Sequence, residues 1–241
     1  MKIAIIDERI SDEALRSLEI RGFHTVRLPR HPNLGEAVAS HTDMLLTRLG
    51  DELISTAEYC ERYPYIFTDL SQMLLGYRLS FTSDELQARY PDDAKLNLLV
   101  MGKYLFAKLD TVSQYALDAA RRLGLTAVPV KQGYPACTVL KLSDKVAVTA
   151  DCGMAAALSS VGIRVVKIED GHISLPPYDF GFIGGCAGVF QNTVYFLGDI
   201  EAHPSYGLIK DAADSLGMDI VSLSHEPLRD LGGILFIEGN L

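Results

Sequence analysis

The sequence predicts a mixed α/β fold in which five copies of one module, a β-hairpin followed by a helix and a further strand, close into a ring. Two features recur together along the chain: an apolar–turn–apolar hairpin pattern and a helical stretch that ends in glycine. A third observation concerns the ends of the chain. The last residues supply only the first half of a hairpin and the first residues supply the second half, so the terminal strands should pair.

The hairpins are the first landmark. Each consists of two short apolar runs joined by a tight polar turn, which is typical of paired antiparallel strands. The complete copies occupy residues 43–57, 95–109, 133–151 and 186–199, and the divided copy is made of 232–240 and 1–7. A doubly wound parallel sheet is disfavoured, because parallel strands cannot be joined by two-residue turns.

The second landmark is a glycine between each helical stretch and the strand after it. A helix commonly ends where a left-handed residue closes its last turn, and glycine adopts that conformation without strain. The glycines in step with the hairpins are Gly22, Gly76, Gly124, Gly162 and Gly217. Each therefore predicts the end of one helix and the start of a third strand.

A ring closed by its own termini has no internal boundary, so we expect one domain over residues 1–241. Its approximate modules are 1–42, 43–94, 95–136, 137–185 and 186–231, with 232–241 closing onto 1–7.

Composition narrows the possible partners. The 241 residues carry a formal net charge of −9, which disfavours a nucleic-acid backbone and is compatible with a cationic small molecule. No apolar run approaches the length of a membrane span, and the first residues enter a strand directly rather than forming a signal peptide. The four cysteines have neither metal-ligand spacing nor a paired framework, so we expect reduced thiols in a cytoplasm, no metal and no cofactor. The oligomeric state stays open.

Aligning the hairpins on their turns identifies the equivalent position at the start of the first strand in each copy. The first strands then begin at Asp43, Lys95, Cys137, Cys186 and Gly232. If these strands line a central channel, as the innermost strands of propeller-like rings do, their first residues meet at one mouth.

Cys137 and His41 form the most specific pair at this mouth. A nucleophilic thiolate needs a lowered pKa, and an imidazole can return a proton to a leaving group at neutral pH. Asp43, two residues after His41, should face the same side of an extended strand. The alternative is that Cys137 is a small buried apolar residue and His41 a loop residue. Cys186 is a second candidate nucleophile.

Two further features are less specific. Glu8 and Arg9 end the first strand, where a carboxylate could hold a cation or an imidazolium, although acidic residues at a helix start are also common. The run Gly181–Gly188 leads into a strand rather than a helix, so it is better explained by close backbone approach than by phosphate binding.

These motifs resemble the pentein-fold guanidine-modifying enzymes, which include agmatine and arginine deiminases, dimethylarginine dimethylaminohydrolase and amidinotransferases. The Gly-Gly strand motif at Gly232, the Glu8-Arg9 pair, His41-Thr42-Asp43 and the cysteine motif ending at Cys137 follow the family order if the chain is circularly permuted. Where the agmatine branch has a glutamate before Gly-Gly, this chain has Leu231 and, one residue earlier, Asp230. Ile234 stands where relatives that bind guanidinium through Gly-Gly-Asp have an acid, so the sequence is divergent.

The resemblance implies a pentein fold and a hydrolase or transferase acting on a guanidino or amidino carbon through a thiouronium-type intermediate. Cys137, His41 and Glu8 would be catalytic, and Asp43, Asp230 and Arg9 would bind the cationic substrate. Pentein-fold proteins without catalytic activity also exist, so a binding or assembly protein is the alternative.

Overall fold

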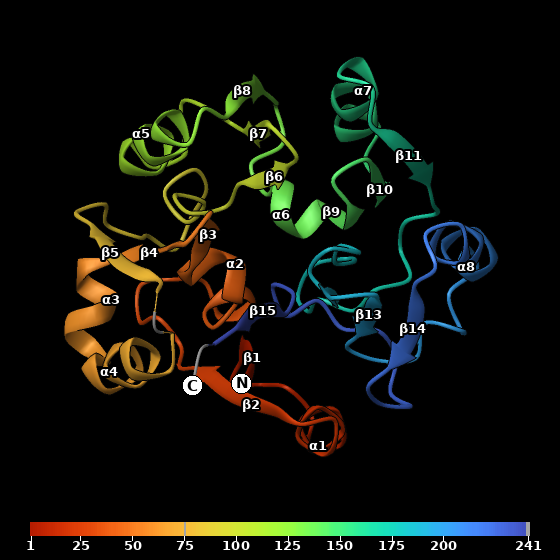
Figure 1. Cartoon of the computed structure of the whole chain (residues 1–241), viewed down its shortest axis with the longest axis horizontal. Coiled ribbons are helices and arrows are strands. Elements are labelled where there is room, and N and C mark those ends of the chain that lie inside the picture. Colours follow the sequence, from red (N-terminus) through yellow and green to blue (C-terminus); the bar gives the residue numbers. More distant parts are fainter. Residues whose placement is uncertain (75, 240–241) are drawn as a thin grey trace.

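The computed structural model describes residues 1–74 and 76–239. Within these ranges the chain forms five sheets of three strands each, with helices between them. Figure 1 shows the sheets following one another around the molecule in the order of the chain.

The sheets share one plan, an antiparallel hairpin whose second strand pairs in parallel with a third strand beyond a helix. Four of them are made of consecutive strands. They are β3 (Thr47–Leu49), β4 (Glu52–Thr56) and β5 (Arg78–Thr82); β6 (Leu99–Met101), β7 (Tyr104–Ala107) and β8 (Thr126–Pro129); β9 (Val139–Ser143), β10 (Val146–Thr149) and β11 (Arg164–Lys167); and β12 (Ala187–Phe190), β13 (Thr193–Phe196) and β14 (Asp219–Ser222). Each of these four sheets thus has the order hairpin, helix and strand.

The fifth sheet joins the two ends of the chain. β15 (Leu235–Glu238) pairs antiparallel with β1 (Lys2–Asp7), with Ile237 opposite Ile3, and β1 pairs in parallel with β2 (Phe23–Leu28). The amino group of Met1 donates a hydrogen bond of 2.8 Å to the carbonyl of Gly239. The predicted pairing of the terminal strands is thus correct.

The first strands of the hairpins are neighbours: β15 contacts β12, β12 contacts β9, and β9 contacts β6. The five sheets nevertheless remain separate in the described part of the chain, and none of them closes on itself. The structure supports a mixed α/β arrangement of five repeated sheets, and the sheets do not merge into one closed barrel.

The helices of the modules are α1 (Asp12–Ile20), α3 (Ala57–Arg62), α4 (Pro64–Met73), α5 (Gln114–Arg122), α7 (Cys152–Ser160) and α8 (Tyr206–Asp214). Side-chain oxygens cap several helix starts: Ser11 accepts from the amide of Ala14 and Asp151 from that of Met154. The predicted glycines Gly22, Gly76, Gly124, Gly162 and Gly217 all have positive φ. Glycine ends these helices because the left-handed backbone carries no Cβ penalty.

Two predicted strand starts are short helices instead. Asp43 lies in α2 (Thr42–Leu45) and Cys137 lies in α6 (Pro135–Thr138), and the strands begin only at Thr47 and Val139. Pro135 occupies the first turn of α6, where its missing N–H costs nothing and its fixed φ suits a helix. A further short 3-10 helix, η1 (Glu36–Val38), lies in the loop before α2.

Aromatic packing connects the first and fifth modules. Phe23 on β2 contacts Phe190 on β12 edge-to-face, with ring centroids 5.2 Å apart, and Phe236 on β15 lies 4.8 Å from Phe23. Buried aromatic pairs of this kind stabilise a core beyond the area they bury. They hold the sheet formed by β15, β1 and β2 against β12. No helix in the described residues is long and apolar enough to cross a membrane.

Candidate active site

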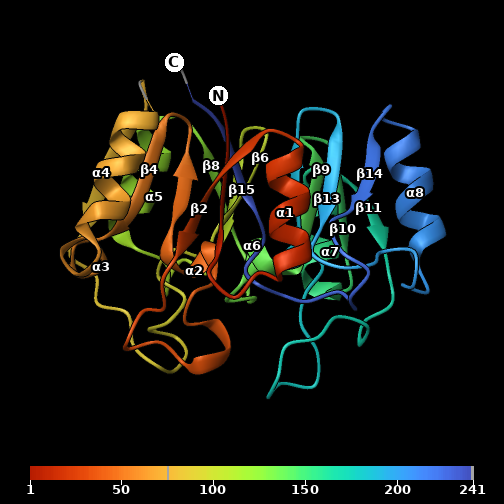
Figure 2. The same ribbon diagram turned by 90° about the horizontal axis from the view of Figure 1, so that it is seen from below.

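Three long loops gather on one side of the molecule, at the lower edge in Figure 2. They connect β2 with α2, β5 with β6, and β11 with β12. Together with α2 and α6 they enclose a cavity of about 320 Å³, to which these loops contribute Val38, Asp93 and Tyr178 respectively. The predicted convergence of distant segments is therefore observed here.

Cys137 lies on this cavity and is 4% exposed. Its thiol donates a hydrogen bond to Oδ2 of Asp43. Nδ2 of Asn97 lies 3.0 Å from the same carboxylate oxygen and 3.7 Å from Sγ, and Oδ1 of Asn97 accepts a 2.9 Å bond from the amide of Ala136. One asparagine thus connects α2 and α6 and fixes the thiol beside the carboxylate.

His41 precedes α2 and is 1% exposed. Its Nδ1 lies 3.8 Å from Oδ1 of Asp230, and the donor atoms of His41, Cys137 and Asp230 all lie within 4.8 Å of one another. These three atoms are close enough to share a metal ion, if one were bound. Both ring nitrogens of His41 lack a hydrogen-bond partner among the described residues. Buried polar atoms are normally satisfied, so these nitrogens indicate a site for a ligand.

Asp230 is 1% exposed and is held by the backbone. Its Oδ2 accepts a 2.8 Å bond from the amide of Phe182, and its Oδ1 accepts a 3.0 Å bond from the amide of Gly232. Two backbone donors and the nearby imidazole orient this carboxylate toward the cavity wall.

The glycine-rich run before β12 passes between Asp230 and α6. A Cβ at Gly185 would lie 2.0 Å from Oδ1 of Asp230, and one at Gly184 would lie 2.7 Å from the carbonyl oxygen of Cys137. The amide of Gly185 donates a 3.0 Å bond to that same carbonyl. Close backbone approach, as predicted, explains why these positions are glycine.

Burial sets the protonation states of the site. It raises the pKa of Asp43 to about 7 and that of Asp230 to about 6. Burial, followed by the charges of Asp43 and Asp230, raises the pKa of the Cys137 thiol well above its usual value. Burial, with the nearby charge of Arg9, lowers the pKa of His41 to about 3. These shifts favour a neutral thiol and a neutral imidazole rather than a preformed thiolate–imidazolium pair.

Glu8 and Arg9 do not line this cavity. Glu8 is exposed and accepts a 3.0 Å bond from the amide of Arg30. Arg9 pairs with Asp7 at 2.5 Å and donates to the carbonyl of Ala37 at 2.9 Å. The position of Glu8 does not support a part in the chemistry, whereas Arg9 fixes the loop that carries Val38 and lies close enough to His41 to lower its pKa.

The other residues aligned on the turns have different surroundings. Lys95 pairs with Asp92 at 2.7 Å, and Asn97, two residues further on, takes the place beside Cys137. Cys186 is fully buried among apolar side chains and donates to the carbonyl of Ile183 at 3.3 Å. It does not line the cavity, so the structure distinguishes it from Cys137.

Acidic and aromatic side chains form the rest of the cavity wall. The hydroxyl of Tyr134 donates a 2.8 Å bond to Oδ2 of Asp93, whose Oδ1 has no partner among the described residues. Leu175 and three aromatic residues, Tyr178, Phe180 and Phe182, complete the side formed by the β11–β12 loop. Sequence reasoning missed Asn97, Asp93 and Tyr134. The sequence signal for them was weak: Asp93 and Tyr134 shortly precede the strands predicted to begin at Lys95 and Cys137, and Asn97 lies inside the first of these strands.

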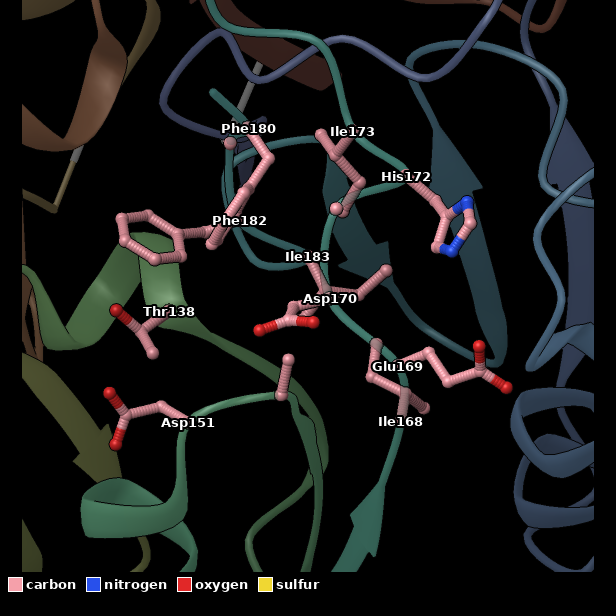
Figure 3. A pocket seen from close by; sticks show the side chains of 13 residues that line it. Thr138, Asp151, Ile168, Glu169, Asp170, His172, Ile173, Phe180, Phe182 and Ile183 are labelled. Atoms are coloured by element: carbon pink, nitrogen blue, oxygen red, sulfur yellow. The ribbon is translucent and has the colours of Figure 1, made fainter. Parts of the chain in front are cut away.

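A second cavity, of about 260 Å³, adjoins the first and is shown in Figure 3. Thr138 and Asp151 lie on one side of it, and Ile168 and Glu169 lie on the other. Phe180 and Phe182 line both cavities and separate them. The space beside Cys137 therefore has an immediate neighbour behind these two phenylalanines.

Comparison with solved structures identifies the fold of the chain. The chain aligns with a dimethylarginine dimethylaminohydrolase adduct with 4-chloro-2-hydroxymethylpyridine at a TM-score of 0.58 and 10% identity, covering 93% of this chain and 92% of that chain. The Pseudomonas aeruginosa enzyme, a cysteine-to-serine mutant complexed with citrulline, aligns at 0.56 and 10% identity, with 93% and 91% covered. An agmatine deiminase from C. jejuni aligns at 0.53 and 7% identity, with 92% and 87% covered. At such identities the similarity shows the fold, which is the pentein fold.

The sequence itself places the chain in a family. Residues 5–235 match the model described as a family of unknown function, DUF6873, and the chain belongs to that family. No curated protein matches the sequence.

Proposed function

We propose that this protein is a cysteine-dependent hydrolase or transferase that acts on the guanidino or amidino carbon of a small cationic molecule. One observation carries the proposal: Sγ of Cys137, the imidazole of His41 and the carboxylate of Asp230 lie within 4.8 Å of one another on a single cavity. The pentein fold supports it, because the similar structures are guanidino-modifying hydrolases, deiminases and amidinotransferases.

The charge of the substrate supplies the activation that the protein alone does not. Burial, and then the charges of Asp43 and Asp230, raise the pKa of the Cys137 thiol, because a buried thiolate beside two carboxylates is unfavourable. Asp230 lines the cavity beside Cys137, whereas Asp43 lies outside its lining and contacts the thiol directly. A guanidinium bound in the cavity next to Asp230 and Sγ reverses that effect, since a positive charge within a few ångströms stabilises the carboxylate and the thiolate. The thiol is then reactive when its substrate is bound.

The first half-reaction forms a covalent intermediate. The proton of the Cys137 thiol passes to His41, and the sulfur bonds to the guanidino carbon. The bond between that carbon and the leaving nitrogen breaks, and His41 gives the proton to the departing amine. The enzyme is left with a thiouronium group on Cys137 and a neutral His41.

The second half-reaction releases the enzyme. A water molecule gives a proton to His41 while its oxygen bonds to the thiouronium carbon, and the carbon–sulfur bond breaks. His41 returns a proton to the thiolate, and the second proton of the water leaves to solvent, where the departed amine binds it. The product is a ureido compound. In a transferase an acceptor amine would replace the water.

The experiment is site-resolved alkylation. We expect 2-chloroacetamidine, a cationic reagent shaped like an amidine, to label Cys137 faster than neutral iodoacetamide does, as followed by intact mass and peptide mapping between pH 6 and pH 9. Asp230→Asn removes the negative charge and should abolish the preference. Cys152 is an internal control, because it is exposed and does not line the cavity.

Two outcomes contradict the proposal. Equal, slow labelling of Cys137 by both reagents would indicate an inert buried thiol and favour a non-catalytic binding or assembly protein on the same fold. Selective labelling that persists in Asp230→Asn would show that the Asp230 carboxylate is not the group that recognises the cation.

A further inference from the structure

The walls of the Cys137 cavity carry charge of only one sign. Asp93, Asp179 and Asp230 line it, and among the residues that the structure describes no lysine or arginine does. The adjoining cavity has a similar composition: its acidic residues are Asp151, Glu169 and Asp170, and within the described part of the chain no basic residue other than His172 lines it. A carboxylate brought into either space would meet like charges and no fixed cation.

Asp93 is the group best placed to recognise a second part of a ligand. It is 6% exposed, and burial raises the pKa of its carboxyl. Oδ2 accepts the hydroxyl of Tyr134, while Oδ1 is buried and has no partner among the described residues. An unpaired buried carboxylate oxygen is costly, so it indicates a place for a hydrogen-bond donor.

Asp93 is carried by a different segment of the chain from the reacting groups. It lies in the β5–β6 loop and reaches α6 through Tyr134, whereas Asp230 is held by the β11–β12 loop through the amide of Phe182. Apolar and aromatic side chains, among them Leu175, Tyr178 and Phe182, also line the cavity. This arrangement suits an apolar chain with a donor group at its far end.

From these observations we propose that the cavity selects guanidino or amidino compounds that carry a cationic hydrogen-bond donor at the end remote from the reacting carbon. The cavity excludes compounds with a carboxylate at that end. Asp93, positioned by Tyr134, determines this selection. The inference rests on the proposed function, because it assumes that the guanidinium binds beside Cys137.

The test compares alkylguanidines that differ only at the remote end: ammonium, methyl or carboxylate, each with spacers from propyl to hexyl. Dissociation constants come from calorimetry, and protection of Cys137 from 2-chloroacetamidine confirms where each compound binds. At the best spacer we expect the ammonium compound to bind about tenfold more tightly than the methyl compound, which is the usual size of a hydrogen bond to a buried charge. The carboxylate compound should bind about tenfold more weakly than the methyl compound.

Two variants distinguish the effect of the Asp93 carboxylate on binding from the effect of the overall negative charge of its loop. Asn at position 93 still accepts the Tyr134 hydroxyl, so Asp93→Asn should fold, keep its affinity for the methyl compound and lose the advantage of the ammonium compound. Asp92→Asn removes one negative charge from the same loop at a residue that does not line the cavity, and it should leave the ranking unchanged.

The possible failures can be told apart. If the methyl compound binds and protects Cys137 but the ammonium compound binds no more tightly at any spacer, or Asp93→Asn leaves the ranking intact, the inference is wrong and the proposed function stands. If the carboxylate compound binds as tightly as the methyl compound, the inference is likewise wrong. If none of the compounds protects Cys137, both the inference and the proposed function are wrong.

Discussion

The thiol of Cys137 donates a hydrogen bond to Oδ2 of Asp43, a residue 94 positions away in the sequence. Asn97 donates to the same oxygen, so the carboxylate, the amide and the thiol form one buried cluster. This contact connects the chemistry of the site to its electrostatics, because the Asp43 carboxylate makes ionisation of the thiol less favourable while the hydrogen bond from the thiol favours the ionised carboxylate. Several measurable consequences follow.

Asp43→Asn should change how stability depends on pH. The pKa of Asp43 is about 7 in the folded chain, above its ordinary value of 3.8, so the folded state holds a proton that the unfolded chain releases. The stability due to the protonated carboxyl is complete below about pH 4 and is lost as the pH rises to about 7. Relative to wild type, the variant should gain about 1.4 kcal/mol of unfolding free energy per pH unit across that window. Urea denaturation at several pH values measures this difference, and a pH-independent difference would contradict it.

His41→Gln should show the opposite dependence. The folded-state pKa of His41 is about 3, below its ordinary value of 6.5, so its contribution is complete above about pH 6.5 and is lost as the pH falls toward 3. The unfolding free energy of the variant relative to wild type should therefore rise by about 1.4 kcal/mol for each unit of acidification in that window. Urea denaturation at several pH values measures this difference as well. The Asp43→Asn variant is the control, because its unfolding free energy relative to wild type should change with pH in the opposite direction. A difference that grows toward neutral pH instead would show that the imidazole is protonated in the folded protein.

Gly185→Ala should damage both stability and the site. The new Cβ would lie 2.0 Å from Oδ1 of Asp230, so either the carboxylate or the backbone must move. We expect a loss of about 2 kcal/mol or more in unfolding free energy, as overpacking at buried positions commonly gives, together with loss of preferential labelling by 2-chloroacetamidine. Gly207→Ala is the matched control: this glycine lies in α8, its Cβ would meet no atom within 4 Å, and alanine should stabilise the helix by about 0.5–1 kcal/mol. Equal thermal stability of the two variants would contradict the packing described here.

The two fully buried thiols should respond differently to substitution. Cys137→Ser keeps a donor for Asp43 and should change the unfolding free energy by no more than about 1 kcal/mol, while abolishing labelling at that position. Cys186→Ala removes a sulfur from a packed apolar cluster and should cost about 1–2 kcal/mol while leaving Cys137 reactive. Thermal unfolding and peptide mapping of both variants check the pair. The assignment of roles fails if Cys186→Ala abolishes the preferential labelling and Cys137→Ser does not.

Much of the fold could be predicted because its landmarks are local. A tight turn between two apolar runs, or a glycine such as Gly124 at a helix end, is decided by a few neighbouring residues, and the five repeats made each landmark support the others. The pairing of β15 with β1 followed from the same repeat. Alignment on the turns also selected Cys137, His41 and Asp43, and the family resemblance added Asp230; the structure brings these four residues close together, and their roles stay predictions.

The rest depended on geometry that the repeat does not contain. Counting back from the turns placed Lys95 beside Cys137, but that hairpin has no helical turn before β6, and Asn97 occupies the position instead. The contact of Asp93 with Tyr134 joins two loops of irregular shape, which no periodic pattern describes. Glu8 matched a motif, yet its carboxylate accepts the amide of Arg30 outside the cavity.

The covalent role of Cys137 is the central claim, and mass spectrometry of acid-quenched reactions tests it most directly. The protein is mixed with the alkylguanidine that best protects Cys137, quenched at a series of times and digested. We expect the peptide containing Cys137 to gain an amidino group during turnover, and the same peptide from Cys137→Ser to remain unmodified, while the Cys186→Ala variant behaves as wild type. A compound that occupies the cavity and protects the thiol, yet never modifies it at any time or pH, would contradict the claim and identify the protein as a binding protein.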